Sequence, residues 1–372
     1  MINLHLYPSS FKYESRMLKE ANTIVRHQLA SRVIIMSAWE SGQPRIERIT
    51  DKILVHRIKT LFTGRSKVGK ALFYFEFYFR AVRYGLRIKP RALNCHSLMM
   101  LPIAVVVKKF RSTKLIYDPH ELETERLGLS GLAQHISKWV ERKLVRHCDA
   151  IIVVSPSIKR WYESSYPGLP VSLVRNVPVL TTSTTSTLLR ETLGIPEGQL
   201  IFLYQGLVNE GRSIDLYLDV FAKIQAHHLV IMGYGPLEDH VRQFADRHAN
   251  IHFHPAVPPN KVLAYTQSAD VGLSLIENCC LSYYYSLPNK FFEYIMAEVP
   301  PIVSNFPDMS GIVNQHGIGW SINVSADDLY SLINRLSMSE IIFQKKKISE
   351  VKNQLCWENE EPALISVFKS LQ

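Results

Sequence analysis

The sequence predicts an α/β protein with two doubly wound domains, each built on a parallel sheet. Short apolar segments rich in β-branched residues, such as 33–36 and 151–155, alternate with longer amphipathic segments. Strands that alternate with helices in this way are typical of parallel sheets. A chain of 372 residues exceeds what one hydrophobic core usually holds, so we expect two domains.

Apolar runs mark the expected strands, and a change of composition marks the domain boundary. The runs are 1–7, 33–36, 53–55, 92–96, 114–117 and 151–155, then 200–206, 228–233, 251–254, 269–276 and 302–305. Residues 181–187 consist only of Ser and Thr, which is the composition of a linker. We therefore expect one domain over residues 1–178 and a second over residues 190–356.

The cysteines and the apolar runs predict a cytoplasmic protein. The five cysteines are odd in number and lack the spacing of a metal site, so we expect reduced thiols. The N-terminus begins a strand without the basic region of a signal peptide. The longest apolar run, residues 98–107, is too short to span a bilayer.

The net charge of +10 is concentrated in the first half of the chain. Residues 1–180 carry 30 basic and 13 acidic side chains, a net +17, and the remaining residues carry 13 and 20, a net −7. A positive field favours an anionic partner, such as a membrane surface, a lipid-linked acceptor or a nucleic acid.

Residues 57–91 are strongly basic, with ten Lys or Arg and one acid, Glu76, around the aromatic block 73–79. Interfacial helices combine aromatic rings at the headgroups with cations on anionic lipid, so the segment predicts peripheral membrane contact. A core helix with a solvated basic rim explains the same residues. Nucleic-acid binding is the third interpretation of this segment. We do not expect a nucleic-acid partner, because no aromatic platform or helix-turn-helix signature accompanies the charge.

Residues 287–303 hold the strongest pattern for a ligand site. We expect a helix that follows Pro288, is capped by Asn289 and is stopped by two prolines. The N–H groups and dipole at such a helix start favour phosphate. Glu293, one turn in, shares a face with Asn289 and Lys290, where a carboxylate can accept hydrogen bonds from a ribose diol. A capped helix with a solvated Glu293 is the alternative.

Two strands of the second half end in glycine-containing loops. The loop after Gly206 contains Arg212, which can pair with a diphosphate through two hydrogen bonds or can be an exposed loop arginine. The loop after Gly233 fits the edge of a ligand crevice. The tyrosine-rich segment 277–286, with Tyr285, forms either a pocket wall or a packed surface loop.

In the first half, strand 114–117 is followed by a polar cluster that contains His120. Ligands of open α/β sheets bind beyond the carboxyl ends of the strands. A histidine among carboxylates can orient hydroxyl groups or transfer a proton. A capped helix start with a surface histidine explains the same residues.

These segments resemble the retaining glycosyltransferases with the GT-B fold, of family 4 and group 1 type, which build bacterial surface polysaccharides. The most specific parts of the resemblance are residues 287–303, 204–213 and 114–125. The resemblance implies two Rossmann-like domains that face a cleft, with the acceptor side first and the nucleotide-sugar domain second. It also implies that the last helix, residues 357–372, packs back on the first domain.

The resemblance implies a role for each candidate residue. Glu293 matches the last glutamate of the family's Glu-x7-Glu motif, which binds the ribose of the donor. Arg212 and Lys290, with the helix start at Asn289, would stabilise the departing diphosphate. His120 would lie beside the reacting sugar, with Glu121 and Glu123 as acceptor-side contacts. The remaining predicted donor contacts are Gly206, Gly233 and Tyr285.

The predicted reaction moves a sugar from a UDP-sugar, or next a GDP-sugar, to a saccharide or lipid-linked saccharide with retention of configuration. The diphosphate itself is the usual proposal for the base in this family, so no protein nucleophile, metal or other cofactor is expected. The product would enter a capsule, an O-antigen or an exopolysaccharide. We expect the protein in the cytoplasm, peripheral on the inner face of the plasma membrane.

The chain departs from the family pattern at two positions. The first glutamate of the motif falls at Tyr285, and the second basic residue of the diphosphate loop falls at Leu207. Two alternatives therefore stay open. One is a non-catalytic binding subunit with the GT-B fold, and the other is a sugar-nucleotide epimerase of the same architecture.

Overall fold

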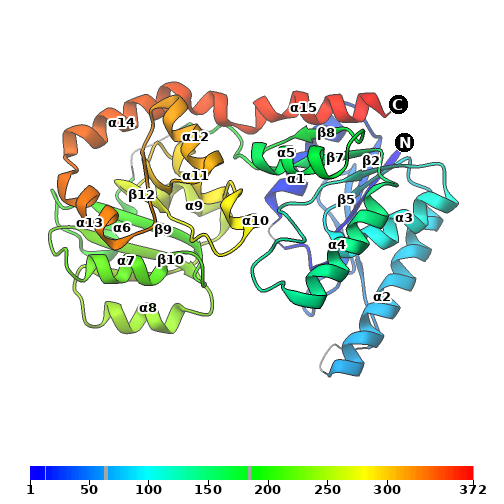
Figure 1. Ribbon diagram of the computed structural model, residues 1–372, viewed down its shortest axis with the longest axis horizontal. Helices are drawn as coiled ribbons and strands as arrows, with labels where there is room; N and C mark the ends of the chain where they lie inside the picture. Colours follow the sequence, from blue (N-terminus) through cyan, green and yellow to red (C-terminus); the bar gives the residue numbers. More distant parts are fainter. Residues whose placement is uncertain (13, 63–65, 183–185, 372) are drawn as a thin grey trace. The chain divides into compact units, whose positions relative to one another are not determined.

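The computed structural model describes residues 1–12, 14–62, 66–182 and 186–371, and it divides into two compact units (Figure 1). Unit 1 comprises Met1–Arg175 and Glu360–Gln372, and unit 2 comprises Asn176–Asn359. Residues 183–185 of the predicted linker lie outside the described residues.

Unit 1 is built on an eight-stranded sheet that is parallel except at one edge. The antiparallel pair joins the two strands at that edge, β3 and β4. The central strands are buried on both faces, which is typical of parallel sheets covered by helices. The strand order is β3 (Ile46–Arg48), β4 (Ile53–Ile58), β2 (Arg32–Ala38), β1 (Ile2–Leu6), β5 (Ala92–Cys95), β6 (Lys114–Tyr117), β7 (Ala150–Val153) and β8 (Val171–Leu173).

The helices of unit 1 follow the apolar pattern of the sequence. In the first helix the buried residues include Met17, Ala21 and Ile24, which recur at helical spacing. In the last helix, Glu361 accepts a hydrogen bond from Thr23 at 2.8 Å. The helices are α1 (Ser15–Arg26), α2 (Lys67–Ile88), η1 (Leu98–Met100), α3 (Leu101–Phe110), α4 (Gly131–Val145), α5 (Pro156–Ser165) and α15 (Trp357–Ser370), which begins in unit 2.

Unit 2 is built on a six-stranded parallel sheet. The strand order is β11 (Ile251–Pro255), β10 (His228–Tyr234), β9 (Ile201–Leu207), β12 (Val271–Ser274), β13 (Pro301–Ser304) and β14 (Trp320–Ile322). The helices are α6 (Leu188–Leu193), α7 (Ile214–Phe221), α8 (Glu238–Ala245), α9 (Pro259–Thr266), α10 (Leu281–Tyr284), α11 (Asn289–Met296), α12 (Pro307–His316), α13 (Ala326–Arg335), α14 (Met338–Val351) and η2 (Lys352–Leu355).

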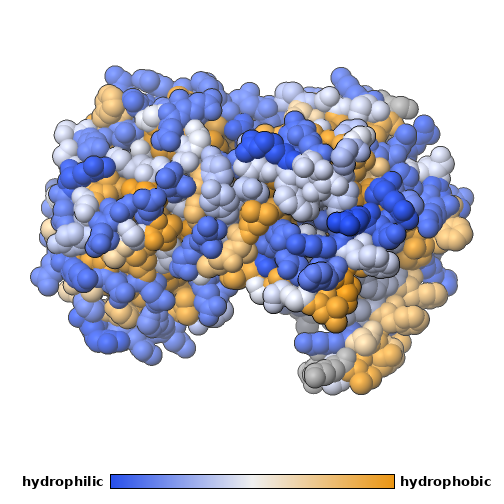
Figure 2. All heavy atoms as spheres, viewed as in Figure 1, coloured by the Kyte–Doolittle hydropathy of each residue, from blue (hydrophilic) through white to orange (hydrophobic). Residues whose placement is uncertain are grey.

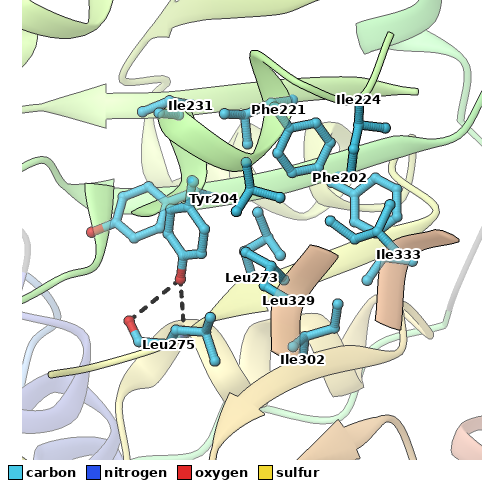
Figure 3. Close-up of a cluster of buried hydrophobic side chains, with 14 of the residues drawn as sticks. Phe202, Tyr204, Phe221, Ile224, Ile231, Leu273, Leu275, Ile302, Leu329 and Ile333 are labelled. Carbon is cyan, nitrogen blue, oxygen red and sulfur yellow. Dashed lines mark hydrogen bonds between the residues drawn. The ribbon is translucent and has the colours of Figure 1, made fainter. Parts of the chain in front are cut away.

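Side chains from one face of this sheet and the helices that cover it form an apolar core. Figure 3 shows Phe202, Leu273 and Ile302 of three adjacent strands together with Leu329 and Ile333 of α13. The α/β class with two parallel sheets, predicted from the sequence, is confirmed. The short strands β3, β8 and β14 were not predicted, because three residues carry too little periodicity. Among the described residues, no helix has the length and apolar character needed to cross a membrane.

A buried tyrosine fixes α11 against the sheet of unit 2. The Tyr294 hydroxyl lies 2.9 Å from the carbonyl oxygen of Leu203 and 3.2 Å from that of Leu273, and it accepts a hydrogen bond from the Gln205 N–H at 3.1 Å. Its ring covers Gly272, where a Cβ atom would lie 2.4 Å from the ring. A side chain at residue 272 would therefore displace the helix.

We expect Gly272→Ala to lower the free energy of unfolding of the protein by about 2 to 3 kcal/mol, because overpacking forces a shift of the ring or the strand. Chemical denaturation with a fluorescence readout measures the change. Gly311→Ala is the matched control, since a Cβ there meets no atom within 4 Å on an exposed helix surface. The control should raise stability by about 0.5 to 1 kcal/mol, and equal effects of both variants would contradict the packing argument.

Candidate functional site

Helix α11 begins at Asn289, and its N-cap residue is Pro288. The prediction that Asn289 caps the helix is therefore wrong. Pro288 already has the extended backbone of an N-cap residue, with φ −71° and ψ 145°. The Asn289 side chain instead accepts a hydrogen bond from Asn176 at 2.7 Å. Among the described residues, no side chain forms a capping hydrogen bond with the first turn.

Lys290 holds a buried ammonium group at the start of α11. The residue is 8% exposed, and its Nζ lies 3.6 Å from the centroid of the Tyr204 ring. Within the described part of the chain, Nζ has no hydrogen-bond acceptor. Burial lowers the pKa of Lys290 well below its usual value, and the charge of Arg212 lowers it further, whereas Glu293 opposes both. Such a group is unfavourable unless an anion approaches it.

Arg212 lies on the loop after β9, with its guanidinium 4.5 Å from the centroid of the Tyr283 ring. The loop is tied to the tyrosine-rich segment by Glu277, which accepts a hydrogen bond from the Ser213 N–H at 3.2 Å. The structure thus places Tyr283 against Arg212, while Tyr285 packs against its neighbour Tyr284 in the chain with ring centroids 5.4 Å apart.

Glu293 is held by a side chain that the sequence analysis missed. The Gln205 amide nitrogen donates to a carboxylate oxygen of Glu293 at 2.5 Å. The amide oxygen of Gln205 accepts from the Thr266 hydroxyl at 2.7 Å, which fixes the orientation of the amide. Gln205 is a polar residue inside the apolar run of β9, and this is the signal that could have found it.

Gly206 and Gly233 are paired residues at the carboxyl ends of β9 and β10. A Cβ atom at Gly233 would lie 1.9 Å from the carbonyl oxygen of Gly206, so no larger residue fits there. Gly206 has φ +119°, a conformation that favours glycine. These glycines allow the strand ends to approach each other just before the loop that carries Arg212.

A cavity of about 270 Å³ opens at the carboxyl ends of β12, β13 and β14. Four of its six lining residues have polar side chains, and Glu277 connects it to the Arg212 loop. The lining residues are Glu277, Asn278, Asn305, Phe306, Asn323 and Val324.

In unit 1, buried titratable groups gather at the carboxyl ends of β1, β5 and β6. The Nε2 atom of His120 lies 3.1 Å from Nδ1 of His96, which in turn lies 3.1 Å from a carboxylate oxygen of Asp118. The other Asp118 oxygen accepts from Arg16 at 2.8 Å. Burial lowers the pKa of His120 to about 3, although Asp118 opposes this shift. His120 is therefore neutral at physiological pH.

Two carboxyl groups of this cluster have pKa values that are shifted in opposite directions. Burial raises the pKa of Glu20 well above its usual value, and the neighbouring Asp118 raises it further. Burial also acts to raise the pKa of Asp118, but Arg16 and His96 outweigh it and hold this pKa well below its usual value. Arg16, whose Nε lies 3.0 Å from Glu20, opposes the upward shift of the Glu20 pKa.

Two sets of side chains in this cluster have potential ligand atoms within 4.8 Å of one another. One set is His5, Glu20 and His96, and the other is His96, Asp118 and His120. The guanidinium of Arg16 lies 2.8 Å from Asp118 and 3.0 Å from Glu20, one carboxyl group of each set, and its charge would repel a metal ion.

Glu123, predicted as an acceptor-side contact, is 7% exposed and lies 3.4 Å from Arg126. Burial raises the pKa of Glu123 from its usual 4.5 to about 7, although Arg126 opposes the shift. The folded state therefore favours the protonated form. The stability that this preference contributes is fully present below about pH 4.5 and is lost as the pH rises through about 7.

We expect Glu123→Gln, which mimics the protonated form, to match the wild type near pH 4.5 and to exceed its stability by about 3 kcal/mol at pH 8. Denaturant unfolding at a series of pH values measures the difference. Glu163→Gln, a change at an exposed carboxylate, is the control and should keep the pH dependence of the wild type. A constant difference between Glu123→Gln and wild type would contradict the shift.

Two family models match the two halves of the chain. The model of glycosyl transferases group 1 matches residues 185–353, and the model of glycosyltransferase family 4 matches residues 22–177. A curated relative is the lipopolysaccharide 1,2-N-acetylglucosaminetransferase of Salmonella typhimurium, 28% identical over 205 residues. The match covers 54% of this chain and spans about half, 50%, of that relative.

Solved structures of similar fold cover nearly all of the chain. Sucrose-phosphate synthase from Thermosynechococcus elongatus has a TM-score of 0.77 at 15% identity, with 100% of this chain and 98% of that chain covered. HepE of Anabaena in complex with UDP-glucose has a TM-score of 0.74 at 11% identity. WaaG, a glycosyltransferase involved in lipopolysaccharide biosynthesis, has a TM-score of 0.69 at 13% identity. In both comparisons 100% of this chain and 100% of the other chain are covered. With the family models matching in both halves, the chain belongs to the group 1, family 4 glycosyltransferases with the GT-B fold.

Proposed function

We propose that the protein is a retaining glycosyltransferase that moves a sugar from a nucleoside diphosphate sugar to a saccharide acceptor of a bacterial surface polysaccharide. The observation that carries the proposal is the Lys290 ammonium. It is buried, has no hydrogen-bond acceptor among the described residues, and lies close enough to Arg212 for their charges to interact. Two cations at a helix start suit a diphosphate.

The two cations would act on the leaving group. As the bond between the sugar and the diphosphate breaks, negative charge grows on the diphosphate, and nearby fixed cations then stabilise it more strongly than in the ground state. The approach of a phosphate would also raise the pKa of Lys290 and favour its charged form. The proposed chemistry therefore uses Lys290 and Arg212 where other transferases use a metal ion.

Glu293 would bind the ribose of the donor. Gln205 orients the carboxylate and occupies one side of it, at 2.5 Å. We favour a UDP-sugar over a GDP-sugar as the donor. The similarity to HepE, whose structure contains UDP-glucose, supports this choice. The sugar class is supported by the name of the Salmonella relative, an N-acetylglucosamine transferase.

We assign the acceptor side to unit 1 and the reacting sugar to His120. Attack on the face of the leaving group, with the diphosphate taking the proton of the acceptor hydroxyl, would retain the anomeric configuration. A non-catalytic binding subunit is the second candidate. It is favoured by Leu207, an apolar residue 42% exposed at the position where the family has a second cation. Nucleotide binding without turnover on any saccharide or lipid extract would support that candidate.

We expect UDP to raise the melting temperature of the protein more than GDP, ADP or CMP, since a ligand at a hundred times its Kd stabilises by about 2.7 kcal/mol. Glu293→Ala should weaken UDP binding about tenfold or more, as expected for hydrogen bonds to a charged group. The same variant should weaken the binding of 2′-deoxy-UDP much less, because this nucleotide already lacks one of the two ribose hydroxyl groups.

Two results would overturn the donor-site assignment. One is the absence of a thermal shift with every nucleotide tested. The other is an equal loss of affinity for UDP and for 2′-deoxy-UDP in Glu293→Ala. Lys290→Met provides the contrast, because it should weaken the binding of UDP strongly and the binding of uridine, which has no diphosphate, hardly at all.

Helix α2 supports peripheral contact with an anionic membrane. Its residues Val68, Leu72, Phe75 and Phe79 recur at helical spacing, and each is between 39% and 74% exposed. Figure 2 shows this apolar surface along α2 at the lower right. Exposed Lys70, Arg83 and Arg87 lie on the same helix. Apolar side chains flanked by cations are typical of an interfacial helix.

The opposite face of α2 packs against unit 1. Tyr84 stacks on His56 with ring centroids 4.1 Å apart, and a Cβ atom at Gly85 would lie 2.8 Å from Val107. The exposed Leu61 precedes the helix, and Glu76 accepts its N–H at 2.7 Å. The packed face holds the helix, so the exposed face could insert without unfolding it. A membrane site of this kind would suit a lipid-linked acceptor.

We expect Phe75→Ser with Phe79→Ser to reduce binding to vesicles containing anionic phosphatidylglycerol at least tenfold, since each buried phenylalanine contributes about 1.5 to 3 kcal/mol. Vesicle co-sedimentation at two salt concentrations measures the loss. Ile342→Ser with Phe343→Ser on α14 is the control, because these residues are 59% and 55% exposed. Equal binding by both double variants would argue against the α2 surface.

A further inference from the structure

A line of hydrogen bonds runs across three adjacent strands of unit 1 and ends at His120. Asn3 and His5 lie on β1, His96 follows β5 and His120 follows β6. Asn3 Oδ1 lies 2.7 Å from Nε2 of His5, whose Nδ1 lies 2.8 Å from Nε2 of His96. Nδ1 of His96 lies 3.1 Å from Nε2 of His120. The proposed reaction uses only the last of these residues.

A backbone carbonyl fixes the direction of the whole line. The Asn3 side-chain nitrogen donates to the carbonyl oxygen of Ala92 at 3.2 Å and to Asn94 at 2.9 Å. A carbonyl oxygen can only accept, so the reversed Asn3 amide would place two acceptors against each other. The Asn3 oxygen must therefore face His5, and Nε2 of His5 must carry the hydrogen.

Each histidine then fixes the next one. Burial lowers the pKa of His5 well below its usual value, so its ring is neutral and its Nδ1 is an acceptor. His96 must donate to it from Nε2. In the arrangement with a single hydrogen on the His96 ring, Nδ1 of His96 is then an acceptor, and the hydrogen between His96 and His120 belongs to Nε2 of His120.

The neighbouring carboxyl groups are consistent with this arrangement of hydrogens. Both oxygens of Glu20 and Oδ2 of Asp118 are buried without a hydrogen bond among the described residues. Their close contacts are to cationic or ring nitrogens, since Glu20 Oε1 lies 3.0 Å from Nε of Arg16 and Asp118 Oδ2 lies 3.1 Å from Nδ1 of His96. A proton on Glu20 supplies a donor for the adjacent Asp118. The free oxygen of Asp118 then needs no hydrogen from His96, and no unpaired cation has to be buried.

We propose that Asn3 and His5 are positioning residues that act through His96 to hold His120 with its hydrogen on Nε2, so that Nδ1 of His120 accepts a hydrogen bond from a hydroxyl of the reacting sugar. The presence of a sugar at His120 rests on the proposed function, whereas the tautomer does not. Nδ1 makes no hydrogen bond with the described residues, and His120 is half-buried.

A second arrangement with the same number of protons gives the opposite result. Moving the proton of Glu20 to Nδ1 of His96 would make Nε2 of His120 an acceptor and would leave the hydrogen on its Nδ1. That arrangement separates charge between Glu20 and His96, which are 0% and 2% exposed. The two arrangements therefore predict different tautomers of His120, and these can be measured.

Long-range ¹H–¹⁵N correlation spectra of the full chain, labelled at histidine nitrogen, report which ring nitrogen carries the hydrogen. His120→Gln, at a half-buried position, assigns the His120 signals. We expect a protonated Nε2 and a bare Nδ1 in wild type from about pH 5 to 8, because burial lowers the pKa of His120 to about 3. A hydrogen on Nδ1 in wild type would overturn the proposal, and His120→Gln is the one variant that has to fold for this test.

His5→Phe removes the acceptor for His96 and should shift His120 toward the Nδ1–H form. The chain offers a matched control in unit 2, where His228 and His252 stack with ring centroids 5.1 Å apart, against 4.9 Å for His5 and His96. Both pairs also share an N···N distance of 2.8 Å. His228→Phe should leave the His120 signals unchanged, and an unchanged His120 in His5→Phe would overturn the proposal.

If the proposed transfer activity is observed, His5→Phe should lower kcat about tenfold to a hundredfold, the range expected for one misdirected hydrogen bond, with little change in the KM for the donor. Wild-type kcat in His5→Phe, despite an altered tautomer, would overturn the link to the sugar. Absence of transfer in the wild type would overturn the proposed function and leave the tautomer result standing.

Discussion

The contact between Tyr294 and Gly272 decides where the candidate donor site of unit 2 can form. The tyrosine hydroxyl bonds the backbone of β9 and lies within reach of β12, and its ring occupies the space that a side chain at Gly272 would need. Helix α11 is thereby held with its first residues at the carboxyl ends of these strands. The positions of Lys290 and Glu293 relative to Arg212 follow from this contact.

The two units differ in whether their buried polar groups have partners inside the protein. In unit 1, Asp118 pairs with Arg16 and the histidines can bond one another, so these groups have partners inside the protein, while Glu20 has an ion-pair contact with Arg16 but no hydrogen bond among the described residues. In unit 2, the Lys290 ammonium lacks an acceptor within the described residues. Buried polar groups are normally satisfied, so an unsatisfied cation points to a ligand and a satisfied network points to the orientation of a neighbour.

Much of the candidate site could be predicted because its residues lie at strand ends. Arg212, Glu293 and His120 each follow a recognisable apolar strand or open a helix, and both places are readable from periodicity and turn residues. Gln205, Thr266, His5 and His96 were missed, because they are single polar residues inside or beside apolar runs. What they do depends on neighbours that are as far as 91 residues away in the chain.

The sequence by itself determined the α/β class, the two parallel sheets and the family, because alternating periodicity and local motifs depend on residues close together in the chain. Only the tertiary structure decided that Pro288 caps α11, that the Lys290 ammonium is buried, and that Asn3 is linked to His120. Burial, pKa and hydrogen-bond direction are set by groups that the sheet brings together from distant segments, and no local pattern records those contacts.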